Sequence, residues 1–140
     1  MSRETNVLIL EDDPYLSIEL RTSLLEKGFH AFICKNATEA IELCKQHEFD
    51  VAVVDIFVVE EENLIPNGGL SFMSNLKNEP QAPLKTSKNI PVIAISGGVS
   101  IRHGSNPLVT AMALGAVATL TKPFSHEQLI TTIQEFTTSS

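Results

Sequence analysis

Five short apolar runs alternate along the chain with segments of helical periodicity, and this alternation restricts the possible folds more than any other feature. The runs are rich in branched residues and occupy residues 7–10, 31–34, 51–54, 90–95 and 117–120. Between and after them, apolar residues recur every three or four positions, as in Leu16, Leu20 and Leu24, which is the spacing of one helix face. Strands that are apolar on both faces and alternate with helices are typical of a parallel sheet covered on both sides. The pattern therefore predicts an α/β fold with five parallel strands.

The expected helices begin and end at residues that suit helix boundaries. Asp13 precedes Pro14, and we interpret it as a helix cap rather than a metal ligand, because its side chain can satisfy backbone N–H groups of the first turn. Residues 36–39 and 125–128 have the spacing of a capping box. Gly28 and Gly115 suit helix ends, where the chain turns into a left-handed conformation.

Length, charge and cysteine content narrow the class of protein further. A chain of 140 residues suits one domain, and we expect a single domain over residues 1–140. The net charge of −7 has the wrong sign for neutralising nucleic-acid phosphates, so direct nucleic-acid binding is not expected. No apolar run approaches the roughly 20 residues that span a membrane, which predicts a cytoplasmic protein without a membrane partner. Cys34 and Cys44 fall on a buried strand and an inner helix face, which predicts free thiols.

Two connections at the carboxyl end of the predicted sheet are longer than usual. Residues 56–67 follow the third strand and include the acidic run Glu60–Glu62, and residues 97–106 follow the fourth strand. Open α/β folds bind ligands at this end of the sheet, so extra chain there favours a functional role. We interpret residues 56–67 as a candidate lid, and a passive solvated insertion stays open as the alternative.

Several chemically active side chains fall where the predicted strands end. Glu11 and Asp12 follow the first strand, and three further candidates end the third, fourth and fifth strands: Asp55, Ser96 and Lys122. The carboxyl ends of parallel strands meet at one edge of a sheet, so we expect these side chains to lie together. Clustered carboxylates repel one another unless a cation neutralises them, and hard oxygen ligands suit Mg²⁺. One carboxylate could then accept a phosphoryl group, with the lysine and the hydroxyl stabilising its oxygens.

These residues and their neighbours resemble the receiver domain of two-component response regulators over essentially the whole chain. The matching segments are Val7–Asp13, Val53–Asp55, Pro91–Gly97, Gly115–Ala116 and Thr121–Phe124. The resemblance implies a flavodoxin-like, doubly wound sheet with strand order 2-1-3-4-5, an order for which a member of this family is a standard example. In that order the first and third strands are neighbours, which brings Glu11 and Asp12 beside Asp55.

The resemblance also implies a role for each acidic residue of the site. Asp55 would accept the phosphoryl group and would bind Mg²⁺ together with Asp12. Glu11 would help to hold the metal through a water molecule. Phe57 would offer the metal only its backbone carbonyl group.

The remaining site residues follow the family in part. Lys122 would contact the phosphoryl group, Ser96 would supply the switch hydroxyl, and the peptide bond between Lys122 and Pro123 would be cis. The chain departs from the family at Thr119, where an aromatic residue often rotates on phosphorylation. It departs again in two longer segments, residues 56–67 and 97–104.

The resemblance implies a signalling domain rather than a turnover enzyme, and we expect it to stand alone because the chain ends at Ser140, just after the last expected helix. It would take a phosphoryl group from a histidine kinase or a histidine phosphotransfer protein and change its affinity for a downstream protein. An interaction domain with an altered or lost phosphorylation switch stays open as the alternative. A phosphatase of the haloacid dehalogenase type is disfavoured, because Phe57 stands where that class has a second Asp after Asp55. A flavodoxin is disfavoured too, because acids follow the first strand in place of a phosphate-binding loop.

Overall fold

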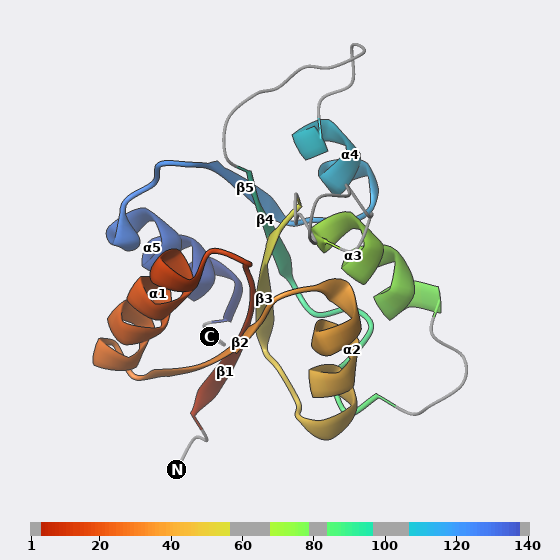
Figure 1. Ribbon diagram of the computed structural model, residues 1–140, viewed down its shortest axis with the longest axis horizontal. Helices are drawn as coiled ribbons and strands as arrows, with labels where there is room; N and C mark the ends of the chain where they lie inside the picture. Colours follow the sequence, from red (N-terminus) through yellow and green to blue (C-terminus); the bar gives the residue numbers. More distant parts are fainter. Residues whose placement is uncertain (1–3, 57–67, 79–83, 97–106, 138–140) are drawn as a thin grey trace.

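The five strands form one parallel sheet with helices on both faces (Figure 1). The computed structural model describes residues 4–56, 68–78, 84–96 and 107–137. The strand order is β2-β1-β3-β4-β5, which confirms the predicted fold class and order. The elements in chain order are β1 (Thr5–Leu10), α1 (Pro14–Glu26), β2 (Phe29–Cys34), α2 (Ala37–Gln46), β3 (Val51–Asp55), α3 (Gly69–Asn78), β4 (Val92–Ser96), α4 (Pro107–Ala113), β5 (Ala118–Thr121) and α5 (His126–Thr137).

Alternate residues of each central strand face opposite helical layers. In β1, Val7 and Ile9 pack in the core with α1 and α5, whereas Leu8 and Leu10 pack in the core with α2 and α3. All four side chains are fully buried. Burial on both faces explains why β3 carries no polar residue before Asp55, which stands at its carboxyl end.

The boundaries of all five strands differ slightly from the predicted ones: β1 begins two residues earlier, at Thr5, and β3 ends one residue later, at Asp55. β2 begins at Phe29 rather than Ala31, because the first two residues of β1 provide pairing partners for its first two residues. β4 begins at Val92 rather than Ile90, since Pro91 lacks the N–H group that a sheet ladder needs. β5 starts and ends one residue later than predicted, where it pairs in register with β4.

The predicted ends of α1 are confirmed. The Asp13 side chain accepts hydrogen bonds from the backbone N–H groups of Tyr15 at 2.9 Å and Leu16 at 3.3 Å, so it caps the helix. Gly28 follows the helix with a φ of +89°, a conformation that residues with a side chain rarely adopt. Gly115 has a φ of +110° just beyond α4, as predicted.

One capping box is confirmed and the other differs in one bond. At the start of α5, Ser125 and Gln128 exchange hydrogen bonds of 3.0 Å between each side chain and the other's backbone N–H. At the start of α2, the Asn36 side chain accepts from the Glu39 N–H at 2.9 Å. The Glu39 carboxylate, however, accepts from the N–H of Lys35 at 2.9 Å, one residue before the position that the motif predicts.

Other predictions concern thiols, membranes and loops. Cys34 and Cys44 are free and buried, and burial raises the pKa of Cys44 to about 11 and the pKa of Cys34 well above its ordinary value. Among the described residues, the helices lack the length and hydrophobicity that a membrane-spanning segment needs. Residues 57–67 and 97–106 lie outside the described part of the chain. The lid interpretation and the metal-binding carbonyl of Phe57 therefore stay predictions.

Candidate functional site

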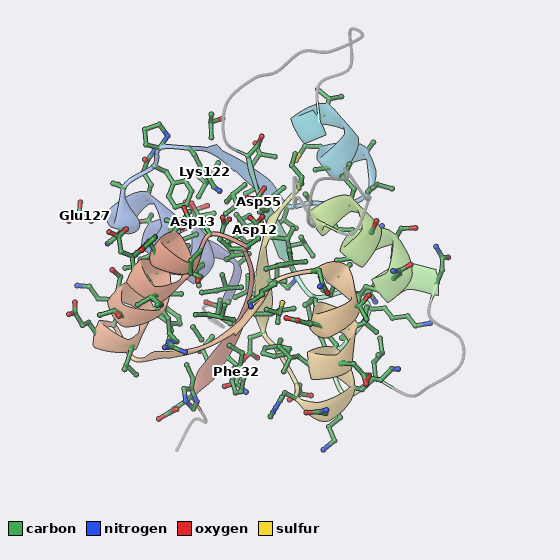
Figure 2. All side chains as sticks on the ribbon, in the orientation of Figure 1. Asp12, Asp13, Phe32, Asp55, Lys122 and Glu127 are labelled. Atoms are coloured by element: carbon green, nitrogen blue, oxygen red, sulfur yellow. The ribbon has the colours of Figure 1, made fainter. Side chains whose placement is uncertain are left out.

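The carboxyl ends of the strands bring the predicted site residues to one edge of the sheet. Figure 2 shows Asp12, Asp55 and Lys122 gathered where the central strands end. Backbone hydrogen bonds continue the sheet past the ends of β1, β3 and β5. The Glu11 N–H donates to the last carbonyl of β2 at 3.0 Å, and the Lys122 N–H donates to the Ser96 carbonyl at 2.7 Å. These bonds hold the main chain from which the site's side chains project.

Lys122 pairs with two buried carboxylates. Its Nζ donates to Asp55 Oδ2 at 2.9 Å and to both oxygens of Glu11, at 3.1 and 3.0 Å. Burial acts to lower the pKa of Lys122, but the hydrogen bonds to Asp55 and Glu11 outweigh it and raise the pKa above its ordinary value. The lysine is therefore a permanent positive charge held between the two acids.

Glu11, Asp12 and Asp55 each offer an oxygen atom, and these three atoms lie within 4.8 Å of one another. Glu11 and Asp55 are 2% and 3% exposed. Burial, followed by the neighbouring carboxylate of Asp55, raises the pKa of Glu11 from 4.5 to about 7, although Lys122 acts in the opposite direction. The positive charge of one lysine thus leaves the cluster under-neutralised, and its hard oxygen donors fit a divalent cation such as Mg²⁺.

The other predicted positions lie around this cluster. Ser96 is 4% exposed at the end of β4. Thr119, the departure from the family's aromatic residue, is partly buried in β5 and pairs with Ala94. The peptide bond between Lys122 and Pro123 is cis, as the resemblance implies.

Sequence reasoning missed the direct pairing of Lys122 with Glu11. The sequence predicted that Lys122 contacts a phosphoryl group and that Glu11 contacts the metal through a water molecule, but it did not predict a contact between the two side chains. The two residues are 111 positions apart, so no local pattern links them. Their pairing depends on the strand order and on the length of the lysine side chain, which reaches from β5 across the end of the sheet to β1.

The buried position of Glu11 predicts that the stability of the metal-free protein depends on pH. The pKa of Glu11 is about 7 in the folded protein, above its unfolded value, so the folded state binds this proton more tightly. The contribution of Glu11 to the free energy of unfolding is therefore fully present below about pH 4.5 and is lost as the pH rises through 7. Between pH 5.5 and pH 8 the expected loss is about 2 kcal/mol. In the described part of the chain, the charged groups that face Glu11 are Asp12, Asp55 and Lys122.

Chemical unfolding in the presence of a chelator measures this effect. Between pH 5.5 and pH 8, we expect the free energy of unfolding of the wild-type protein to fall by about 2 kcal/mol relative to that of Glu11→Gln, because the amide does not titrate. The variant corrects for the titrating groups that lie outside the cluster of Glu11, Asp55 and Lys122. A stability difference between the two proteins that is the same at both pH values would contradict the prediction.

Solved structures with a similar backbone place the fold in a known class. A CheY-like response regulator receiver domain protein from Methanospirillum hungatei aligns with a TM-score of 0.74 at 20% identity, covering 95% of this chain and 93% of that one. The receiver domain of the Francisella response regulator 1452 aligns with a TM-score of 0.72 at 24% identity, covering 94% and 95%. The fold is therefore that of a CheY-like receiver domain.

Sequence comparison gives the family. The model of the response regulator receiver domain matches residues 7–134, and the chain belongs to this family. An NtrX-like response regulator from Rickettsia typhi is 29% identical over 128 residues, which are 91% of this chain and 24% of that protein. The virulence transcriptional regulatory protein PhoP of Salmonella typhimurium is 26% identical over 128 residues, which are 91% of this chain and 50% of that protein. The chain thus spans from about a quarter to half of the length of these relatives.

Proposed function

We propose that this receiver domain accepts a phosphoryl group on Asp55, with Mg²⁺ bound beside it, and thereby changes its affinity for a downstream protein. The observation that carries the proposal is the contact of 2.9 Å between Lys122 Nζ and Asp55 Oδ2 inside a cluster of three carboxylates. A lysine beside one carboxylate of an acidic cluster is suited to stabilising the negative oxygens of a transferring phosphoryl group.

Asp12 and Asp55 would hold the metal directly, and Glu11 would support it from the buried side of the cluster. When bound, Mg²⁺ neutralises the carboxylates and stabilises charge on the phosphoryl oxygens. Phe57 is expected to add its backbone carbonyl, as the resemblance implies. The charges at the site support this arrangement, because Lys122 pairs with two members of a cluster of three carboxylates and one positive charge does not offset three negative ones.

The transfer itself needs few chemical groups from the protein. A carboxylate oxygen of Asp55 forms a bond to phosphorus while the bond from phosphorus to the donor's imidazole nitrogen breaks. The electron pair of the broken bond stays on that nitrogen, which takes up a proton. Lys122 pairs with the phosphoryl oxygens, and the Ser96 hydroxyl donates a hydrogen bond to one of them. Asp55 ends the step as an aspartyl phosphate.

The donor that we propose is a histidine kinase or a histidine phosphotransfer protein. A surface cavity of about 550 Å³ lies beside Lys122, between the start of α1 and the connection from β5 to α5, and Tyr15 and Phe124 line it. This cavity supports access of a docked donor to the lysine side of the site. The step is a modification of the receiver itself and not turnover of a substrate, so we do not propose an enzyme.

The site supports phosphorylation over the alternative of an interaction domain that has lost its switch. A cluster with the pairing of Lys122 to Asp55 retains the groups that phosphoryl transfer requires, whereas a docking role requires none of them. We also propose that residues 1–140 act as one domain in the cytoplasm, since free buried thiols suit a reducing compartment. That the domain itself does not bind nucleic acid stays a prediction.

Incubation of the wild-type protein with acetyl phosphate or phosphoramidate tests the proposal. We expect the intact mass to rise by one phosphoryl group in Mg²⁺ and to stay unchanged, over the same time, in a chelator. The reagent itself is held constant, so the comparison isolates the metal. No mass increase with either reagent in Mg²⁺ would favour the interaction domain without a phosphorylation switch.

A further inference from the structure

The start of α3 lies unusually close to the main chain of Asp55. Gly69 is the first residue of α3. An ideal Cβ atom built on it would lie 2.9 Å from the carbonyl oxygen of Asp55, 3.0 Å from Val54 Cγ2 and 3.1 Å from Ile56 Cα. Ordinary contacts of a Cβ atom are 3.4–4 Å, so a side chain at this position requires a shift of about half an ångström.

Two of the three contact atoms belong to the backbone, so a rotamer change cannot relieve them all. Helix α3 is held in the core by Phe72, Met73 and Leu76, which are at most 3% exposed, and moving the helix would disturb all three. The end of β3 is paired on one side only, where the Ile56 N–H also donates to the Ile95 carbonyl at 3.0 Å. The pairing of β3 with β1 stops at Val54, and Asp55 is paired with β4 alone.

We propose that Gly69 is a positioning residue for Asp55. Because Gly69 has no side chain, α3 can pack directly against the end of β3. This packing determines the position of the Asp55 carboxylate relative to Lys122 and to the other two acids of the cluster. This inference rests on the proposed function of Asp55. A displacement of the main chain by half an ångström moves the carboxylate relative to Lys122, and misplacement on this scale slows a reaction severalfold to about a hundredfold.

The test compares Gly69→Ala with Gly28→Ala. Gly28 has a φ of +89° and no atom within 4 Å of an added Cβ, so its substitution strains the backbone at a place remote from Asp55. Both variants are expected to melt several degrees below the wild type, and all measurements are made well below those melting temperatures. Gly28→Ala therefore controls for a loss of stability by itself.

Three quantities are measured in each folded protein. They are the ¹³C resonance of the Asp55 carboxyl group, the Kd for Mg²⁺, and the rate constant for phosphorylation by acetyl phosphate. We expect Gly69→Ala to shift the resonance, to weaken Mg²⁺ binding severalfold and to slow phosphorylation about tenfold. We expect Gly28→Ala to match the wild type in all three. Wild-type values in Gly69→Ala would overturn the positioning role and leave only a packing role.

A second variant keeps the test decisive if Gly69→Ala folds poorly. Val54→Ala combined with Gly69→Ala removes the Cγ2 contact and keeps the contact with the Asp55 carbonyl, and Val54→Ala alone is its reference. A shifted Asp55 resonance in the double variant supports the proposal, whereas a resonance equal to that of the reference overturns it. If the wild type takes no phosphoryl group, the proposed function fails, but the resonance still decides whether Gly69 places Asp55.

Discussion

Replacing Asp55 with Asn is expected to abolish phosphorylation of this protein. Asp55 is the carboxylate that Lys122 contacts at 2.9 Å, and an amide lacks the nucleophilic oxygen that forms the bond to phosphorus. The substitution keeps the shape of a side chain that is only 3% exposed, so we expect the fold to persist. Intact-mass measurement after treatment with acetyl phosphate and Mg²⁺ should show one added phosphoryl group in the wild type and none in Asp55→Asn.

The control for this experiment is Glu127→Gln, which removes one negative charge from the exposed start of α5. We expect it to be phosphorylated like the wild type, because its carboxylate is not part of the acidic cluster. An equal mass increase in Asp55→Asn would move the acceptor to another residue. Peptide mapping of that product would then identify the residue that carries the group.

Replacing Asp12 with Ala is expected to weaken Mg²⁺ binding by at least about tenfold. Asp12 is the partly exposed member of the cluster, and it offers one of three oxygens that lie within 4.8 Å of one another. A divalent cation with few protein ligands depends strongly on each of them, and a tenfold loss corresponds to about 1.4 kcal/mol. Isothermal titration with MgCl₂ on metal-free protein measures the change in Kd.

Asp13→Ala is the matched control, because Asp13 is an acid next to Asp12 with a different role. Its side chain caps α1 through the N–H groups of Tyr15 and Leu16, and loss of a cap costs about 1 kcal/mol of stability. We therefore expect Asp13→Ala to unfold at a lower temperature and to keep its Mg²⁺ affinity within about twofold. Equal Kd values for Asp12→Ala and wild type would remove Asp12 from the metal site.

The elements and many of their ends could be predicted from local sequence. The apolar runs of β1 and β3 identify strands because both faces are buried, so each residue in turn must be apolar. Asp13 before Pro14 identifies the start of α1 because capping depends only on atoms within one helical turn. Asp55 could also be identified from local sequence as a candidate site residue, because an acid at the end of a buried apolar strand needs a charged or hydrogen-bonding partner.

The order of the strands in the sheet could not be predicted from local sequence patterns. Parallel strands that are buried on both faces resemble one another in composition, so periodicity alone does not say which pairs with which. The resemblance to a family supplied the order 2-1-3-4-5, and the structure confirms it. The convergence of Glu11, Asp12 and Asp55 follows from that order, because β1 and β3 are neighbours.

The fold class, the helix caps and the acids at the strand ends could be predicted from local sequence, because each depends on burial or hydrogen bonding within a few residues. Three further features are visible only in the folded chain: Lys122 contacts both Glu11 and Asp55, Glu11 is buried enough to raise its pKa, and Gly69 approaches the main chain of Asp55. These features depend on distances between residues far apart in the chain. Such distances are set by the packing of strands and helices against one another, and no local pattern encodes them.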